Sequence, residues 1–383
     1  MPAIYLDNAA STRVSDDVLA LVTEVMRTAW GNPSSQHPQG AAARAHLDTA
    51  RTRMLAAVNA AAVADVVWTG GCSEANALAV LGAARVRPGA IVISTLEHPA
   101  VSTLADRLEH EGRTVRRIAP GPGGVIDPDE VAAAAKDAAV VALIAVQNEI
   151  GVVQPIAAIA HAVRAAGGNA HLHIDAAQAL GKIALDFAAL AIDSLAIAGH
   201  KLHGPKGIGA LILRTGVTIE PLWVGGGQQS GLRGGTQDAP GAAGLGLAAE
   251  RATAALPAAR ARWLELAGRV TARLRERGVA FHQLVPDQRR APHILALGLA
   301  GVPATALRTV LASRGVYIST GSACAERDGH GKPSPALVAI GLPPDTGMCR
   351  LSFGLDTTED DVDRAAGALA DVALELAARQ RPG

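Results

Sequence analysis

The amino-acid sequence predicts an α/β fold with a mainly parallel sheet of about seven strands, followed by a smaller α+β domain. Apolar runs of strand length recur between residues 66 and 213 with helical stretches between them. Their apolarity is continuous, as in strands buried on both faces. After about Ala248 the pattern changes to a long helix rich in alanine, arginine, leucine and glutamate. Of the 383 residues, 49% are hydrophobic and 18% charged, which is enough apolar material for two domains.

The elements can be placed in chain order. The expected strands of the sheet are residues 66–69, 91–95, 115–118, 140–146, 171–174, 195–198 and 208–213. Beyond them, the long helix runs through Arg275, strands lie near 293–299 and 349–353, and acidic residues after Thr358 mark the start of a last helix. We expect a large domain from 13–248 and a small domain from 1–12 and 249–383.

Charge and cysteine content argue against several classes of protein. Lys and Arg equal Asp and Glu at 35 each, which leaves no net field to attract nucleic acid or an anionic membrane. No apolar run reaches the roughly 18 residues of a membrane span, and the first residues lack the features of a signal peptide. Cys72, Cys324 and Cys349 lie far apart, so neither a disulfide framework nor a metal site is expected. Cys72 and Cys349 fit small turn or core positions. The sequence favours a cytoplasmic protein that acts on a small molecule.

Polar clusters follow several of the expected strands. In open α/β sheets, ligands bind outside the carboxyl ends of the strands, so these clusters are expected to meet in one crevice. The clusters are residues 69–73, 97–98, 147–149, 175–178 and 199–201.

The cluster that ends in Lys201 indicates a type of chemistry. A lysine at the end of a buried strand is held in place, and desolvation lowers its pKa from an ordinary value of about 10.4, so the amine can act as a nucleophile. Asp175 follows another strand, where its carboxylate suits a protonated pyridine nitrogen, and Gln178 and His200 are close in sequence to these two residues. This set suits pyridoxal 5'-phosphate better than any other common cofactor. A helix N-cap is the alternative role for Asp175.

Two glycine-rich segments are candidates for phosphate binding. At residues 70–76 a strand gives way through glycines to a helix, whose free N–H groups and the Ser73 hydroxyl would cradle a phosphate. An ordinary glycine turn capped by Ser73 is the alternative. The segment 225–236 has too many glycines for a regular element, and its Arg233 and Thr236 are further candidates. Its alternative is a flexible surface loop.

Three single residues are candidates for the reaction itself. His98 is placed to lie against a planar ring or to pass protons, and a structural histidine is the alternative. Cys324 is followed by a polar, glycine-rich stretch, which fits an exposed thiol nucleophile that travels. Arg350 is a lone cation in an apolar strand, so it needs an anion: a substrate carboxylate, or alternatively an internal salt bridge.

Taken together, the motifs resemble those of the NifS-like and IscS-like cysteine desulfurases. These enzymes belong to the class V aminotransferases and have fold type I of the pyridoxal-phosphate-dependent transferases. The resemblance covers nearly the whole chain. The matching segments are residues 5–12, 31–37, 69–76, 97–98, 148–155, 175–178, 199–209, 233–236, 321–324 and 350–354.

The resemblance implies a role for each site residue. Lys201 would form the Schiff base with the cofactor, Asp175 would pair with the ring nitrogen, and Gln178 would donate to the ring hydroxyl. His98 would stack on the ring and act as an acid or base. The residues implied to hold the cofactor phosphate are Cys72, Ser73, His200 and Thr236 of the partner subunit. The residues implied to bind the substrate carboxylate are Asn32, Asn148 and Arg350.

The same resemblance implies an activity and its partners. L-cysteine would be converted to L-alanine in an obligate homodimer, with Lys201 removing the α-proton and Cys324 taking the sulfur as a persulfide. A sulfur-acceptor protein would then serve iron–sulfur cluster assembly, or the thiolation of a nucleic acid or cofactor. Alternatives are a selenocysteine lyase, another β-eliminating lyase of the same fold, and a non-catalytic scaffold paralogue.

The sequence departs from the family pattern at three places. Ala198 stands where a serine is usual, which removes a hydroxyl from the phosphate site, and Gln229 stands where glutamate is common. The stretch 325–333 differs from the usual serine- and threonine-rich one. The first two departures are expected to affect the affinity for the cofactor, and the third the identity of the sulfur acceptor.

Overall fold

The central sheet has seven strands in the order β2-β8-β7-β6-β5-β3-β4. The structure, a computed structural model, describes residues 3–321, 334–343 and 346–380. Only β8 runs against its neighbours in this sheet, so the expected mainly parallel arrangement is confirmed. The strands are β2 (Ala64–Thr69), β3 (Ala90–Ser94), β4 (Val115–Ile118), β5 (Ala138–Ile144), β6 (His171–Asp175), β7 (Ser194–Ala198) and β8 (Gly209–Arg214).

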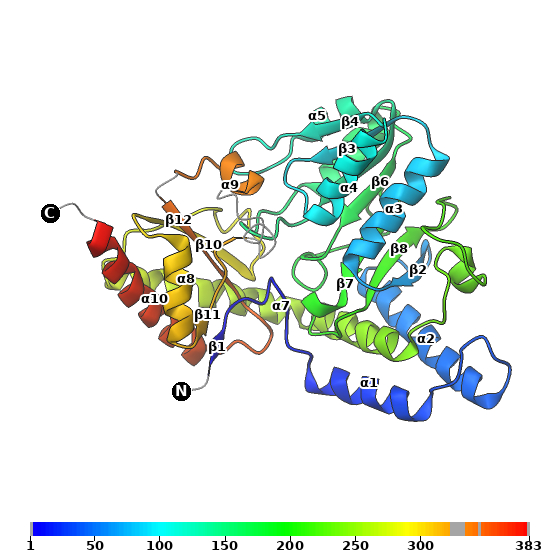
Figure 1. The fold of residues 1–383 in the computed structure, drawn as a ribbon, viewed down its shortest axis with the longest axis horizontal. Helices are drawn as coiled ribbons and strands as arrows, with labels where there is room; N and C mark the ends of the chain where they lie inside the picture. Colours follow the sequence, from blue (N-terminus) through cyan, green and yellow to red (C-terminus); the bar gives the residue numbers. More distant parts are fainter. Residues whose placement is uncertain (1–2, 322–333, 344–345, 381–383) are drawn as a thin grey trace.

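Helices cover both faces of this sheet (Figure 1). Alternate residues of each strand point to opposite faces, so Val66 packs in one hydrophobic cluster and its neighbour Val67 in another. This two-sided burial explains why the strands read as continuous apolar runs. The helices before β7 are α1 (Asp16–Thr28), α2 (Pro38–Ala57), α3 (Cys72–Val86), α4 (Pro99–His110), α5 (Pro128–Ala135) and α6 (Ile156–Ala165).

The long helix α7 (Ala239–Glu276) begins earlier than the sequence pattern indicates. Its first turns contain several glycines and a proline, which have poor helix propensity and conceal the helix in the sequence. Asp238 caps the helix by accepting the Gly241 N–H at 2.9 Å. The first part of α7 packs in the core of the large sheet, and the part from Ala259 onward packs in a second core. One helix therefore contributes to both cores, and the expected division near residue 248 stays a prediction.

A smaller antiparallel sheet has the order β12-β10-β9, and β1 pairs with β11 in a two-stranded parallel sheet. The expected strands near 293–299 and 349–353, and the helix that follows Thr358, are all present. The first residues of the chain reach this part, because the Ser352 N–H donates to the Leu6 carbonyl at 2.8 Å. The elements are β1 (Ile4–Tyr5), β9 (His282–Gln283), β10 (Ile294–Ala300), α8 (Ala304–Ser313), β11 (Val316–Tyr317), α9 (Pro335–Ala339), β12 (Thr346–Ser352) and α10 (Glu359–Gln380).

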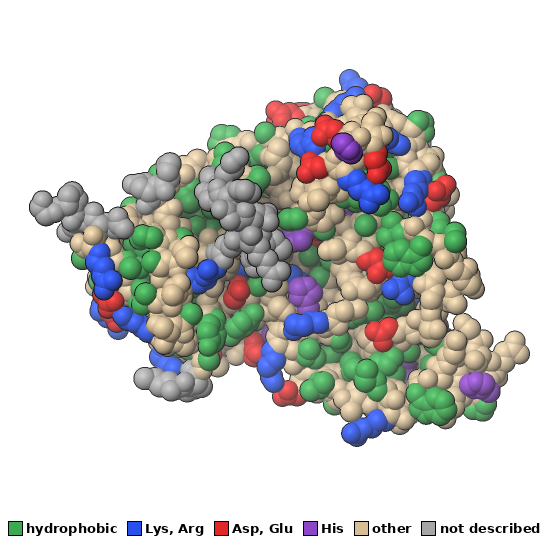
Figure 2. Space-filling model, in the orientation of Figure 1, with side chains coloured by type: hydrophobic (Ala, Val, Ile, Leu, Met, Phe, Trp, Pro, Cys, Tyr) green, Lys and Arg blue, Asp and Glu red, His purple; other side chains and the backbone are tan. Residues whose placement is uncertain are grey.

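Charged side chains of both signs are interspersed over the face of the molecule shown in Figure 2, as equal numbers of acidic and basic residues lead one to expect. No helix in the described part of the chain has the length and apolarity needed to cross a membrane. The described residues also contain no group of three or more histidine, cysteine, aspartate or glutamate side chains placed to hold a metal ion.

Candidate active site

A cavity of about 800 Å³ collects residues from all five polar clusters that follow the strands. The expected convergence at the carboxyl ends of the strands is therefore observed. Arg350 from the small sheet also lines this cavity, so it lies where the two sheets approach each other. The lining includes these candidate site residues: Cys72, Ser73, His98, Asn148, Asp175, Gln178, His200, Lys201 and Arg350.

One end of the cavity is formed by the turn between β2 and α3. The helix begins at Cys72 with Gly71 as its N-cap, and no side chain caps its first N–H groups. Gly71 has a φ of 155°, and a Cβ on Gly209 of β8 would lie 2.5 Å from the Gly71 carbonyl carbon. The two glycines thus let the turn rest directly on the sheet, with uncapped N–H groups next to the cavity. This arrangement suits an anion, and it differs from a turn capped by Ser73.

Lys201 ends a short 3₁₀ turn that directly follows β7. Its ammonium donates to the carbonyls of Ala9 and Ala10, the latter at 3.0 Å, so the N-terminal segment holds the amine. Burial lowers the pKa of Lys201 to about 8, and the positive charge of Arg350 adds to this effect. A larger fraction of this amine is therefore neutral and nucleophilic near neutral pH than at the ordinary lysine pKa of about 10.4.

Asp175 lies at the end of β6, with its carboxylate in the cavity. It accepts hydrogen bonds from the Asn76 amide at 2.7 Å and from the Ala177 N–H at 2.9 Å. The Cys72 sulfur is 3.6 Å away. Burial, together with this carboxylate, raises the pKa of the Cys72 thiol well above its ordinary value, so Cys72 is a protonated turn residue. The bond to Ala177 is a local turn contact, and it leaves Asp175 available to the cavity.

Gln178, His98 and His200 surround these two residues. Gln178 donates one amide hydrogen to the Ala9 carbonyl at 2.7 Å and accepts from His293 at 3.1 Å. His98 caps α4 by accepting the Ala100 N–H at 3.1 Å, which is the structural role that was its alternative. It also lines the cavity. Burial lowers the pKa of His98, and lowers that of His200 to about 4, so both rings are neutral at pH 7.

Arg350 is only 2% exposed. It forms an internal salt bridge, which the sequence offered as the alternative to a substrate carboxylate. Its guanidinium lies 2.6 Å from the Asp7 carboxylate and donates to the Asn148 carbonyl at 2.6 Å. Its Nε has no partner among the described residues. Asp7 was not predicted from the sequence, because the N-terminal segment and β12 are brought together only by the fold.

Not every expected site residue reaches this cavity. Asn32 and Thr236 are absent from its lining within one chain, and Cys324 lies outside the described residues. Asn32 is exposed, and its side chain accepts the Ser34 N–H at 2.9 Å. Arg233 is also absent from the lining and pairs with Glu74 at 3.0 Å.

Gln229 and Ala198 mark two of the departures from the family pattern. The Gln229 amide donates to the Trp68 carbonyl at 2.9 Å and accepts the Trp68 N–H, so it pairs with the edge strand β2. A glutamate carboxylate lacks the donor for this pairing. Ala198 lines the cavity without a hydroxyl.

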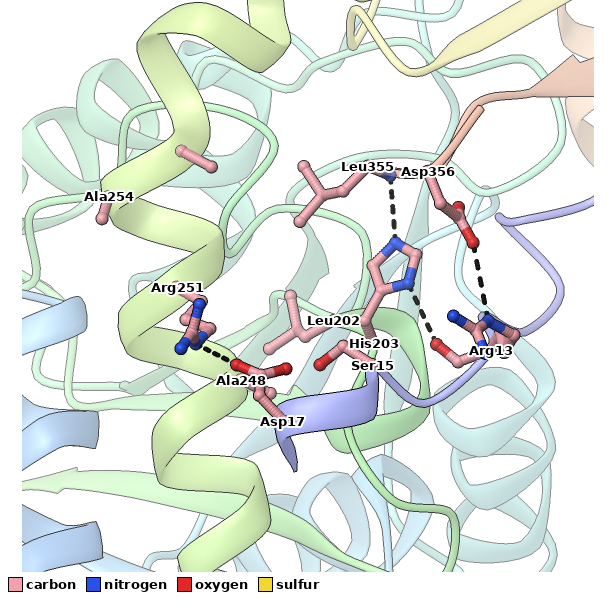
Figure 3. Close-up of a pocket in the computed structure, with 11 residues that line it drawn as sticks. Arg13, Ser15, Asp17, Leu202, His203, Ala248, Arg251, Ala254, Leu355 and Asp356 are labelled. Atoms are coloured by element: carbon pink, nitrogen blue, oxygen red, sulfur yellow. Dashed lines mark hydrogen bonds and ion pairs between the residues drawn. The ribbon is translucent and has the colours of Figure 1, made fainter. Parts of the chain in front are cut away.

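A second cavity, of about 550 Å³, adjoins the loop that follows Lys201 (Figure 3). His203 lines it and donates from Nδ1 to the Arg13 carbonyl at 3.0 Å, while its Nε2 accepts the Leu355 N–H at 3.1 Å. Burial lowers the pKa of His203, which favours the neutral ring that this acceptor role needs. His203 therefore connects the lysine loop to the N-terminal segment and to the segment after β12.

Comparison with known proteins identifies the family. The model of the class-V aminotransferase family matches residues 4–365. The chain is 38% identical to a cysteine desulfurase of Rhodobacter capsulatus, over 98% of this chain and 97% of that protein. It resembles a solved structure titled NifS-like protein, with a TM-score of 0.89 and 28% identity over 97% of this chain and 100% of the other. It also resembles SspA in complex with cysteine, with a TM-score of 0.78 and 30% identity over 91% of this chain and 98% of the other. The chain therefore belongs to the class-V aminotransferase family and, within it, to the pyridoxal-phosphate-dependent cysteine desulfurases.

Proposed function

We propose that this protein takes the sulfur of L-cysteine onto Cys324 as a persulfide, releases L-alanine, and passes the sulfur to an acceptor protein. The single observation that carries the proposal is the cavity that Lys201, Asp175 and Arg350 line together. A nucleophilic amine, a carboxylate and a guanidinium supply three of the interactions that an amino acid bound to pyridoxal phosphate requires.

The cavity residues suit the cofactor. The uncapped N–H groups of α3 and the Ser73 hydroxyl are proposed to hold the phosphate, with His200 beside them. Asp175 is proposed to face the ring nitrogen, and the second amide hydrogen of Gln178 to face the ring hydroxyl. The cofactor, when bound, supplies an electron sink for negative charge at the α-carbon of the amino acid.

The chain's own groups then perform the proton and sulfur transfers. Arg350 orients the α-carboxylate, with Asn148 beside it, and the Lys201 amine removes the α-proton. The Cys324 thiolate attacks the γ-sulfur, so an S–S bond forms while the bond between the sulfur and the β-carbon breaks. The carbon product gains protons, with His98 as the second acid or base, and leaves as alanine.

The described end of the chain before Cys324 supports this assignment. Ser319 pairs with Arg350 through both backbone groups, at 3.1 and 2.7 Å, so the segment that leads to Cys324 starts beside the cavity. Cys324 follows Gly321 by three residues, and three residues of any chain span at most about 11 Å.

The carboxylate site gives a test of the function. L-cysteine is expected to yield alanine, and Arg350→Lys is expected to raise KM about 10- to 100-fold, because lysine lacks the planar fork that binds a carboxylate through two parallel hydrogen bonds. Alanine release is measured against cysteine concentration for both proteins. Arg289→Lys, at a residue outside the cavity lining, is the matched control. An unchanged KM in Arg350→Lys would remove Arg350 from substrate binding.

We further propose that the active unit is a homodimer in which Thr236 of the partner subunit completes the phosphate site. The observation behind this step is that Thr236 does not line the cavity of its own chain. The role of Asn32 in substrate binding stays a prediction.

Mixed dimers test the shared site. Lys201→Ala and Thr236→Asp are each expected to be inactive, the second because its carboxylate repels the phosphate. Co-expression of the two chains with different tags should restore up to about one quarter of wild-type turnover, because a mixed dimer has one site with both native residues. Mixed dimers without activity would contradict a Thr236 contributed by the partner.

A further inference from the structure

A row of hydrogen-bonded side chains leads along the large sheet to Asp175. His171 and Ser194 are 2.7 Å apart, and Ser194 and His173 are 2.8 Å apart. His173 continues to Asn76 at 2.8 Å, and Asn76 donates to Asp175 at 2.7 Å. Each of these side chains is buried. Only Asp175 and Asn76 line the cavity, so the rest of the row lies behind the proposed site.

The strand pattern explains how the row forms. Residues 171, 173 and 175 alternate along β6 and so point to the same face of the sheet. Ser194 begins the neighbouring strand β7, directly opposite His173 in the parallel register. Asn76 belongs to α3, whose apolar side packs on this face of the sheet. The sequence therefore places two histidines, a serine and an amide next to a cluster of apolar side chains.

The donors and acceptors of the row have one consistent order. The Asn76 NH₂ donates to the Asp175 carboxylate, and the Asn76 carbonyl faces His173. The proton of His173 is then on Nε2, and its Nδ1 accepts the Ser194 hydroxyl hydrogen. The Ser194 oxygen in turn accepts from Nε2 of His171. The remaining nitrogen of His171, Nδ1, then carries no hydrogen and needs no acceptor, and it has no partner among the described residues.

The two histidines are uncharged. Burial lowers the pKa of each to about 3, so the row carries no positive charge of its own at neutral pH. The row therefore affects Asp175 through the direction of its hydrogen bonds, because every donor in the row points toward Asp175. The row thus fixes the Asn76 amide with its NH₂ group toward Asp175 and its carbonyl toward His173.

We propose that His173 is a positioning residue that acts through Asn76: it fixes the amide with its NH₂ group toward Asp175 and so keeps that carboxylate oriented toward the cofactor ring. The inference rests on the proposed function, since it takes Asp175 as the partner of the ring nitrogen. Neither histidine of the row contacts the cavity, so His173 is not a catalytic residue.

The test compares two substitutions of His173 in the cofactor-loaded protein. His173→Leu removes the donor, whereas His173→Gln places an amide nitrogen where Nε2 was and keeps it. The readouts are the pH midpoint of the cofactor's visible absorbance and the dissociation constant for pyridoxal phosphate. Asp175→Ala defines the direction in which the midpoint moves when the carboxylate is lost.

His173→Leu is expected to move the midpoint part of the way toward Asp175→Ala and to weaken cofactor binding about 10-fold. His173→Gln should stay within about 2-fold of the wild type, since it keeps the hydrogen bond. In an Asn76→Ala background, His173→Leu should add nothing, because the path to Asp175 is already cut. Ser194→Ala, the least disruptive change to the fold, should move the midpoint in the same direction by less.

Other titratable groups near Asp175 are present in every His173 variant, so differences between these variants do not arise from them. They are Cys72 from α3, Glu97 and His98 before α4, and Lys201 after β7.

Different failures have different meanings. If the pH midpoint of the absorbance shifts in Asp175→Ala but stays at the wild-type value in His173→Leu, the proposed role of His173 is overturned and the proposed function is left intact. A His173→Leu effect that persists in full without Asn76 would overturn the path through the amide. If the pH midpoint of the absorbance in Asp175→Ala equals that of the wild type, the proposed role of Asp175 is overturned, and the inference about His173 with it.

Discussion

Lys201→Ala is expected to lower the turnover of cysteine by at least about 10³-fold, since it removes the amine that we propose both binds the cofactor and takes the α-proton. The cofactor absorbance of the purified variant should be lost or shifted. Lys136→Ala, at an exposed lysine, is the matched control and should behave as the wild type. Turnover in Lys201→Ala within 10-fold of the wild type, an order-of-magnitude bound, would remove the amine from the reaction.

The lowered pKa of Lys201 gives this prediction a pH dependence. Because the folded value is about 8, about one tenth of the amine is neutral at pH 7 and most of it at pH 9. The rate at which cofactor-free protein captures pyridoxal phosphate should therefore rise as the pH increases through about 8 and then level off. Stopped-flow absorbance measures this rate. A rise that continues to about pH 10 would show that burial does not activate the amine.

Cys324→Ala is expected to abolish sulfur transfer from cysteine while the cofactor absorbance stays at the wild-type level. The variant keeps the cavity residues and loses only the thiol that we propose accepts the sulfur. Cys349→Ala is the control, because Cys349 is fully buried in the core of the small sheet and burial raises its pKa to about 12. Alanine and sulfide are measured together. Undiminished turnover in Cys324→Ala would contradict the persulfide mechanism and favour a β-eliminating lyase.

The layers of the fold are predictable from the sequence because they follow from burial alone. Strands covered on both faces are apolar at most positions, and each of the seven expected runs is a strand of the central sheet. The start of α7 was not predictable in the same way. Its early glycines carry a helix only because Asp238 caps it and because α1 and α2 pack against it.

The part of the site that lies at the ends of the strands was predictable from the sequence. Lys201, Asp175 and His98 each lie at the end of a strand or soon after it, so the general rule for open sheets brings them together. Contacts between distant segments were not predictable. The pairing of Arg350 with Asp7 and the row behind Asp175 depend on which strands and helices become neighbours, and no local pattern encodes that.

Two expected site residues, Thr236 and Asn32, do not line the cavity within one chain. The resemblance implies that Thr236 acts from the partner subunit, and the roles of both residues stay predictions.

The mass of the protein after a single turnover tests the persulfide account most directly. The wild-type protein, Cys324→Ala and Cys349→Ala are each mixed with a small excess of L-cysteine, quenched in acid and analysed by peptide mass spectrometry. We predict that the wild type and Cys349→Ala gain one sulfur atom on the peptide that contains Cys324, together with one alanine released per sulfur bound. Cys324→Ala should gain none. Sulfur that appears on another cysteine, or alanine released with the Cys324 thiol unmodified, would contradict the proposed function of this protein.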